Sequence, residues 1–249
     1  MTDADPLAPL LDLADVAPSL HRARDEVDAA LRHRALRRHG GQVAAEISLR
    51  SAVASAALEG HLYPLADVRA GTVTDPAVQG ALRVAEAVPA LADRWPLAPR
   101  QILARLHVLA ARDLVEADSL GRPGGVPGVA NRIDALSALV AGGTSVPALV
   151  VAAVVHAELL TLRPFAGPNG VVARAAGRLT LVAAGVDPRG LLAVEVGHRE
   201  REPEYVGAAG AFATGTPDGI RSWLRHYLTA VELGAQQLTG VADEVLASA

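Results

Sequence analysis

The most apolar part of the chain is a pair of segments separated by a short loop. The first, VPALVVAAVVHAELLT, runs over residues 146–161, and the second, VVARAAGRLTLVAAG, over residues 171–185. A surface helix keeps one polar face, and neither segment has one, so both are predicted to be helices that pass through the core. The loop between them contains two prolines, two glycines and an asparagine, which are residues typical of tight turns.

Helical patterns also account for most of the remaining chain. Ser19 is a suitable N-cap for a helix that continues to His39, where Gly40 and Gly41 favour a stop. Further helices are predicted over residues 42–59, 75–93 and 98–117, then from Pro147, from Gly170, from about residue 202 and over residues 217–238. Pro217 suits the first turn of the last one. About eight helices therefore make the fold class mainly α.

Three stretches lack this helical pattern. Residues 1–18 contain three prolines and four aspartates, which predicts a loose acidic arm. The sequence GRPGGVPG, residues 121–128, is too rich in glycine and proline for regular structure. Between Asn131 and Thr144 we expect a small β-hairpin, with its turn near Gly142 and Gly143. Nothing marks an internal domain boundary, and there are no repeats.

Composition narrows the chemistry that this chain can perform. Half of its 249 residues are apolar but only 3% are aromatic, so the core must consist of Ala, Leu and Val. The absence of cysteine excludes disulfides and thiolate chemistry. All 23 basic residues are arginine, which excludes the lysine of a phosphate-binding P-loop and Schiff-base chemistry. The net charge of −4 gives no support to nucleic-acid binding.

The sequence also gives no sign of a membrane segment. The N-terminus has no basic region of the kind that begins a signal peptide. The longest uninterrupted apolar run, residues 146–155, is too short to span a bilayer. We therefore expect a soluble cytoplasmic protein.

The loop before the second apolar helix has the features of an anion site. Asn169 and Gly170 begin that helix, and the first N–H groups of a helix point out of its positive end. Such an end favours phosphate and other anions. Arg174 follows one turn later, so its guanidinium can reach the same place.

The stretch LRPFAGPNGVVAR, residues 162–174, resembles the signature of the Fic (Fido) family, HPFx(D/E)GNGRxxR. Members of that family transfer AMP, or less often another phosphate-containing group, from a nucleotide to a protein hydroxyl. Five of the nine defined positions match, in order and without a gap. The matching residues are Pro164, Phe165, Asn169, Gly170 and Arg174.

A second motif supports the resemblance. Residues 55–60, SAALEG, fit the pattern (S/T)xxxE(G/N) of the family's autoinhibitory helix, whose glutamate pairs with the last arginine of the signature. In this chain the motif residues are Ser55, Glu59 and Gly60, and the resemblance implies that Glu59 pairs with Arg174. The alternative is an exposed glutamate that fits a short pattern by chance. Weaker similarity in Leu106–His107, in residues 128–132 and around His156 extends the resemblance over about residues 42–230.

On this resemblance the chain divides into three parts. Residues 1–18 are the acidic arm, residues 19–74 hold N-terminal helices that include the inhibitory-type helix, and residues 75–249 form a Fic-like helical domain. In the family the hairpin expected at residues 131–144 is a flap that lines the groove for a target protein. A protein partner is therefore expected at this groove.

Four departures from the signature fall on groups that the family uses for catalysis. Arg163 replaces the histidine that acts as general base, and a guanidinium stays protonated at working pH. Gly167 replaces the acid that holds Mg²⁺, which prefers oxygen ligands. Val171 replaces an arginine that stabilises phosphate, and Pro168 removes one N–H group from the loop. The resemblance thus implies a protein adenylyltransferase in which catalysis is impaired and Mg²⁺ binding is not favoured.

Other residues do not obviously supply the missing groups. His156 lies two turns before Arg163 on the same helix, about 10 Å away along its axis, and is expected to be a core histidine. Glu158 reaches a metal only if the helix end bends, and Asp187 has the features of a turn or N-cap residue.

Several functions remain open at this point. Asn169, Gly170 and Arg174 can hold ATP or another phosphate ligand. The same residues can instead have purely structural roles, with Asn169 as a helix cap and Arg174 as the partner of Glu59. The further alternatives are an active nucleotidyl- or phosphotransferase with unusual residues, a protein-interaction module, and a helical scaffold.

Overall fold

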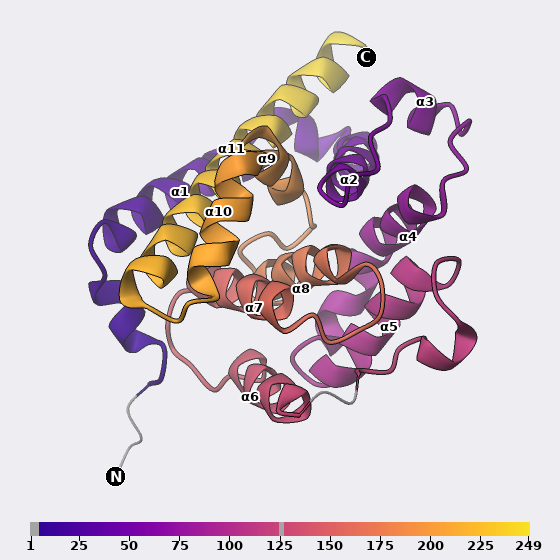
Figure 1. Cartoon of the computed structure of the whole chain (residues 1–249). Coiled ribbons are helices and arrows are strands. Elements are labelled where there is room, and N and C mark those ends of the chain that lie inside the picture. Colours follow the sequence, from indigo (N-terminus) through magenta and orange to yellow (C-terminus); the bar gives the residue numbers. More distant parts are fainter. Residues whose placement is uncertain (1–4, 125–126) are drawn as a thin grey trace.

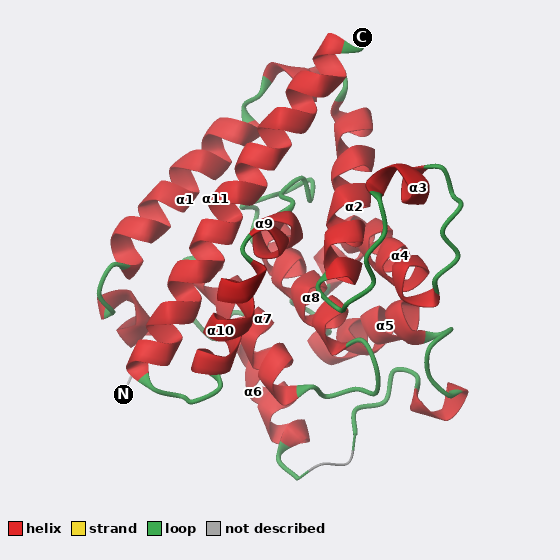
Figure 2. Ribbon diagram, turned by 45° about the horizontal axis from the view of Figure 1, so that its top comes forward, coloured by secondary structure: helices red, strands yellow, loops and turns green. Residues whose placement is uncertain are grey.

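The computed structural model describes residues 5–124 and 127–249, and within them the chain is helical with no strand (Figures 1 and 2). The mainly α class is confirmed. The α-helices are α1 (Val16–Leu31), α2 (Gly40–Ala57), α3 (Leu65–Arg69), α4 (Pro76–Leu91), α5 (Pro99–Ala111), α6 (Val129–Val140), α7 (Ala148–Leu162), α8 (Asn169–Ala183), α9 (Val194–Glu200), α10 (Glu202–Phe212) and α11 (Pro217–Ala247). Short 3-10 helices cover Ala8–Asp12, Arg34–Arg37, Ala92–Arg94 and Ala117–Ser119.

The two apolar segments form the centre of the molecule. Helices α7 and α8 pack along each other, and both are buried over most of their length, as their sequences predict. Helices α4 and α5 cover one side of α8, while α10 and α11 pack on α7. The turn between α7 and α8, which carries the signature-like loop, therefore has neighbours on several sides.

Local sequence explains where several helices begin. Asp75 caps α4, because its side chain accepts hydrogen bonds from the N–H groups of Ala77 and Val78. Thr216 does the same for α11, with Pro217 at the first position as expected. Past the end of α4, the indole of Trp95 donates a hydrogen bond of 3.0 Å to Thr180 of α8. The contact of Trp95 joins the chain just after α4 to the central pair.

Helix α1, near the start of the chain, packs against α11, near its end, and the two lie side by side in both views (Figures 1 and 2). Helix α1 begins at Val16, three residues before the predicted start. It ends at Leu31, and α2 begins at Gly40, so the prediction of one helix that continues to His39 was wrong. Residues 1–4 of the expected acidic arm lie outside the described residues. Asp5 accepts hydrogen bonds from Thr144 and from Ser145.

The expected β-hairpin at residues 131–144 was wrong, because this stretch is mostly helix α6. The reason is a helical spacing of apolar residues: Val129, Ile133 and Leu136 are buried on one face of α6. Gly142, with a φ of +103°, follows the helix end. The glycines therefore stop a helix here and do not turn a hairpin. Residues 125–126 of the preceding glycine-rich loop lie outside the described residues.

Helices α3 and α9 were missed by the sequence analysis because both are short and weakly patterned. Helix α9 has seven residues, and two of its polar side chains, Glu195 and His198, are buried. Over residues 5–124 and 127–249, no helix is both long and apolar enough to cross a membrane.

Candidate functional site

The loop between α7 and α8 is held in shape by the side chain of Asn169. Its Oδ1 accepts a hydrogen bond of 2.9 Å from the N–H of Phe165, and its Nδ2 donates to the carbonyls of Phe165 (2.6 Å) and Gly167 (3.2 Å). Gly167 has a φ of +77° and Arg163 a φ of +44°, so both lie in the left-handed region. Asn169 therefore uses its amide within the loop, and its contribution to an anion site is its place at the start of α8.

His107 of α5 holds the same loop from outside. Its ring stacks on Phe165 with centroids 4.5 Å apart, and its Nε2 donates a hydrogen bond of 2.7 Å to the carbonyl of Ala166. Its Nδ1 accepts from the N–H of Gly121, which fixes the neutral tautomer. Burial lowers the pKa of His107. The loop is thus anchored from two sides by neutral groups.

The N-terminal end of α8 presents free N–H groups. Within the described part of the chain, the N–H groups of Gly170 and Val171 have no hydrogen-bond acceptor. They lie at the positive end of a 15-residue helix. Gly170 has no side chain to cover them. This end of α8 can therefore accept a negatively charged group.

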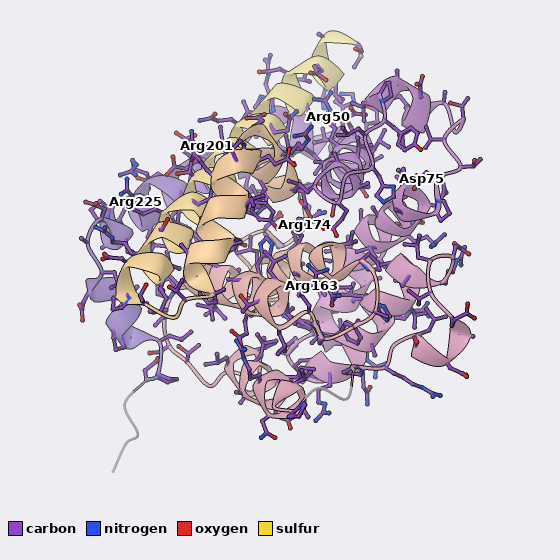
Figure 3. The ribbon with its side chains drawn as sticks, in the orientation of Figure 1. Arg50, Asp75, Arg163, Arg174, Arg201 and Arg225 are labelled. Atoms are coloured by element: carbon purple, nitrogen blue, oxygen red, sulfur yellow. The ribbon has the colours of Figure 1, made fainter. Side chains whose placement is uncertain are left out.

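Arg174, which is labelled in Figure 3, lies one turn further along α8. It is buried and held by several acceptors. Its Nε donates to Ser55 Oγ (2.9 Å), and its Nη2 donates to the Ser55 carbonyl (2.8 Å) and to Glu59 Oε1 (2.8 Å). Its Nη1 donates to the hydroxyl of Tyr205 at 3.2 Å. Burial alone lowers the pKa of Arg174, but Tyr205 and Glu59 outweigh burial and the pKa rises. Arg174 therefore stays positively charged, and its guanidinium is held in one orientation.

Glu59 reaches Arg174 from just beyond the end of α2. The helix ends at Ala57, and Gly60 has a φ of +93°, which lets the chain turn away after the glutamate. The Glu59 carboxylate lies over Gly170, where a Cβ atom would overlap its Oε1. The side chain of Glu59 is 27% exposed and that of Arg174 only 1%. The sequence-predicted contact of Glu59 with Arg174 is thus present, and it places a carboxylate at the start of α8.

Tyr205 of α10 is a site residue that sequence reasoning missed. Its hydroxyl contacts both Arg174 and the Nε2 of His156, at 3.2 Å and 3.0 Å. His156 is 1% exposed, which confirms the expected core histidine. Burial, Arg174 and His226 lower the pKa of His156 well below its ordinary value, so the ring is neutral. Tyr205 is one of only three tyrosines in the chain, and that rarity is the one sequence signal that could have drawn attention to it.

At the four positions that depart from the signature, no side chain can act as a general base or as a metal ligand. Arg163 is exposed at the end of α7, and Val171 is buried among apolar residues. Pro168 is buried too, and Gly167 offers only its backbone. None of these four positions therefore offers a general base, and Arg163 is the only one of them with a charged side chain.

The residues present also do not fit Mg²⁺. Glu158 pairs with Arg132 at 2.6 Å, and the carboxylate of Asp187 accepts hydrogen bonds from the N–H groups of Leu191 and Leu192. Across the described residues, no three His, Asp or Glu side chains come together in a way that could hold a metal ion. Glu59 is already bound to Arg174. Each of these three carboxylates is therefore already engaged by groups of the chain itself.

Comparison with known proteins identifies the fold. No known family model and no curated protein matches the sequence. Among solved structures, a Fic family protein from Desulfovibrio desulfuricans G20 is similar, with a TM-score of 0.71 and 22% identity over 90% of this chain and 74% of that one. Fic-1 from C. elegans, residues 134–508, has a TM-score of 0.70 and 19% identity over 94% and 74% of the two chains. A variant of that segment gives a TM-score of 0.69, with 18% identity over 95% and 74%. The protein therefore has the fold of Fic proteins.

Proposed function

We propose that this protein binds a nucleotide or another phosphate-bearing anion at the N-terminal end of α8, and that Glu59 competes for the same place. The observation that carries the proposal is the Glu59 carboxylate, which lies over Gly170 and pairs with Arg174. A negatively charged group from the chain itself already occupies the site. Its presence indicates what kind of ligand the site accepts.

A phosphate that replaces the Glu59 carboxylate would find its hydrogen-bond donors in place. The N–H groups of Gly170 and Val171 have no acceptor among the described residues, and they point out of the positive end of α8. Arg174 keeps its direction when Glu59 leaves, because Ser55 and Tyr205 still hold its guanidinium. Such a preformed donor set lowers the entropic cost of binding.

We further propose that conventional AMP transfer is impaired in this protein. Arg163 stays protonated and cannot take a proton from a target hydroxyl, and loss of a general base typically lowers the rate by roughly 10²–10⁴-fold. Gly167 offers no metal ligand, and the carboxylate that lies nearest the start of α8, that of Glu59, is paired with Arg174. What is left is a binding site that does not depend on Mg²⁺.

Titration calorimetry with ATP tests the binding proposal. We expect weak or no heat for the unmodified protein and clear binding for Glu59→Gly, with the same affinity in Mg²⁺ and in EDTA. Arg174→Gln should abolish the binding gained by Glu59→Gly. Glu200→Gly is a matched control, since Glu200 is an exposed glutamate at the end of α9 and its loss should change nothing. Absence of binding in the Glu59→Gly protein would refute the proposal.

A labelling assay tests the proposal on catalysis. The unmodified protein and Glu59→Gly are incubated with ATP labelled at the α-phosphate and with a cell extract as a source of protein hydroxyls. We expect no transfer by either protein. Robust labelling by the unmodified protein would instead support the alternative, an active transferase that uses unusual residues.

A further inference from the structure

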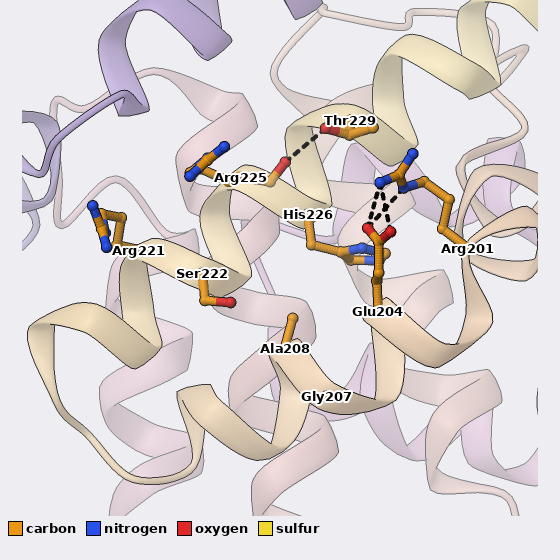
Figure 4. Close-up of a pocket in the computed structure, with 9 residues that line it drawn as sticks. All are labelled: Arg201, Glu204, Gly207, Ala208, Arg221, Ser222, Arg225, His226 and Thr229. Carbon is orange, nitrogen blue, oxygen red and sulfur yellow. Dashed lines mark hydrogen bonds and ion pairs between the residues drawn. The ribbon is translucent and has the colours of Figure 1, made fainter.

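A polar cavity of about 470 Å³ lies between α10 and α11, away from the start of α8 (Figure 4). Arginines are prominent in its lining: Arg201 where α9 meets α10, and Arg221 and Arg225 on α11. Gly207 and Ala208 line it from α10, and their small size leaves the space open. Its volume is within the range of sites for small ligands, roughly 300–1,000 Å³.

The spacing of residues along α11 brings its polar groups to one place. Arg221 and Arg225 are four residues apart, as are Ser222 and His226, so each pair lies on one face of the helix. Figure 4 shows His226 between the α11 arginines on one side and Arg201 on the other. The cavity thus combines guanidinium groups, a hydroxyl and an imidazole.

Arg221 and Arg225 each have only a weak competitor for an incoming anion. Arg221 pairs with Asp218 at 3.3 Å, and that aspartate side chain is 90% exposed. Arg225 pairs with Asp15 at 3.7 Å, and this aspartate side chain is 63% exposed. Pairs of this kind on a protein surface contribute little to stability. A ligand with two negative charges can therefore take over both arginines, whereas Arg201 is held more firmly by two oxygens of Glu204.

His226 supplies an independent indication that a ligand is missing. The residue is only 6% exposed, yet its Nδ1 has no hydrogen-bond partner. Its Nε2 contacts Nδ1 of His198 at 3.0 Å. Nε2 of His198 has no partner either, so in both tautomers of the pair one buried N–H lacks an acceptor, which is costly. When His198 donates in the contact, that group is the Nδ1–H of His226. Burial lowers the pKa of His226 to about 4, so the ring is neutral near pH 7. Because His226 lines the cavity, an anion bound there would lie beside this histidine pair.

We propose that the cavity between α10 and α11 binds a small phosphate-bearing anion through Arg221, Arg225 and His226. Guanidinium groups match the geometry of phosphate oxygens and bind them with charge-assisted hydrogen bonds. Because the cavity is larger than inorganic phosphate, the ligand is a phosphorylated small molecule. This site is formed by other residues than the one at the start of α8, and it does not depend on Glu59.

Calorimetric titration tests the proposal with two probes, inorganic phosphate and glucose 6-phosphate, at constant ionic strength set with chloride. We expect saturable binding at millimolar concentration or below, tighter for the sugar phosphate. The double variant Arg221→Gln, Arg225→Gln should bind at least about tenfold more weakly, because each charge-assisted hydrogen bond contributes that much or more. The control is Arg24→Gln with Arg100→Gln, exposed arginines that pair with aspartates elsewhere. It should bind like the unmodified protein.

Two further measurements separate this site from the one at the start of α8. Arg174→Gln should leave the binding of both probes unchanged, and the imidazole ¹⁵N signals of His226 should shift on titration. Loss of binding in Arg174→Gln but not in the arginine double variant would overturn this proposal and support the other site. Absence of binding, equal effects of the control variant, or His226 signals that stay constant would also overturn it.

Discussion

Replacement of Gly170 by alanine should separate Glu59 from Arg174 without touching either residue. The new Cβ would overlap Glu59 Oε1 and come within 2.9 Å of Arg174 Nη1. Glu59 is the flexible partner, because its side chain is 27% exposed while Arg174 is held by Ser55 and Tyr205. We therefore expect the Glu59 carboxylate to move into solvent, while Arg174 shifts slightly and keeps its contacts with Ser55 and Tyr205.

The size of the effect follows from the contact that is lost. A hydrogen bond to a charged group contributes about 1.5–3 kcal/mol, and the partial exposure of Glu59 puts this one near the lower end. Alanine is a better helix former than glycine and offsets roughly 0.5–1 kcal/mol. Gly170→Ala should therefore destabilise the protein by about 1 kcal/mol, which lowers Tm by roughly 2–4 °C for a chain of this length.

Urea unfolding of four proteins measures the contact directly: the unmodified chain, Gly170→Ala, Glu59→Ala and the double variant. The contact of the new methyl group with Arg174 is present with or without Glu59, so it cancels in this cycle. We expect a coupling energy of about 1.5–2 kcal/mol between positions 59 and 170. Gly240→Ala is the control for helix propensity, because a Cβ at Gly240 in α11 meets nothing within 4 Å.

The cycle can refute the proposed geometry. A coupling energy below about 0.5 kcal/mol, which is the limit of ordinary additivity, would mean that Glu59 does not lie over Gly170. Gly170→Ala also distinguishes two effects, the release of the Glu59 carboxylate from Arg174 and the opening of the anion site to a ligand. Gly170→Ala releases the glutamate but fills its place with a methyl group, so it should not bind ATP, whereas Glu59→Gly should.

Three further predictions concern the surroundings of the site. Tyr205→Phe removes a buried hydroxyl that contacts Arg174 and His156; it should destabilise the protein by about 1–3 kcal/mol in urea unfolding and weaken ATP binding by Glu59→Gly. Asn169→Ala removes three hydrogen bonds to the loop and should lower the free energy of unfolding by about 2–4 kcal/mol, with faster proteolysis at the loop. An unchanged stability would show that Asn169 does not hold the loop in shape. His226 has a folded-state pKa of about 4, below its unfolded value, so the unfolded state binds more protons and stability falls as pH drops below about 6.5. His226 contributes at most about 1.4 kcal/mol per pH unit to this slope, beside the buried His156 and His198, whose pKa values are also lowered, so the slope should be smaller in His226→Gln.

The sequence was informative where one physical signal dominated. The uniform apolarity of residues 146–161 and 171–185 predicted the buried pair α7 and α8 correctly. The contact of Glu59 with Arg174 was implied by two short motifs 115 residues apart. Proline at position 217 correctly indicated a helix start, because its ring suits the first turn.

The sequence failed where the decisive interaction joins distant segments. Tyr205 contacts Arg174 only because α10 packs against α7 and α11, and no local pattern encodes that arrangement. Asn169 has the type and position of a phosphate ligand, yet its amide is used by the carbonyls and N–H of its own loop. The flap prediction at residues 131–144 relied on glycines and family expectation and overlooked the spacing of Ile133 and Leu136 in α6.

The packing of α1 against α11 has a consequence for how the chain is made. The buried face of α1, which includes Val16, Ala23 and Val27, has its main partner near the other end of the sequence. At about 5–20 residues per second on the ribosome, this face waits roughly ten seconds or more after its own synthesis before Pro217 and the rest of α11 follow. During that time an amphipathic helix with an uncovered apolar face is available to chaperones and to other nascent chains. The apolar face of α1 is therefore covered only after α11 has been made.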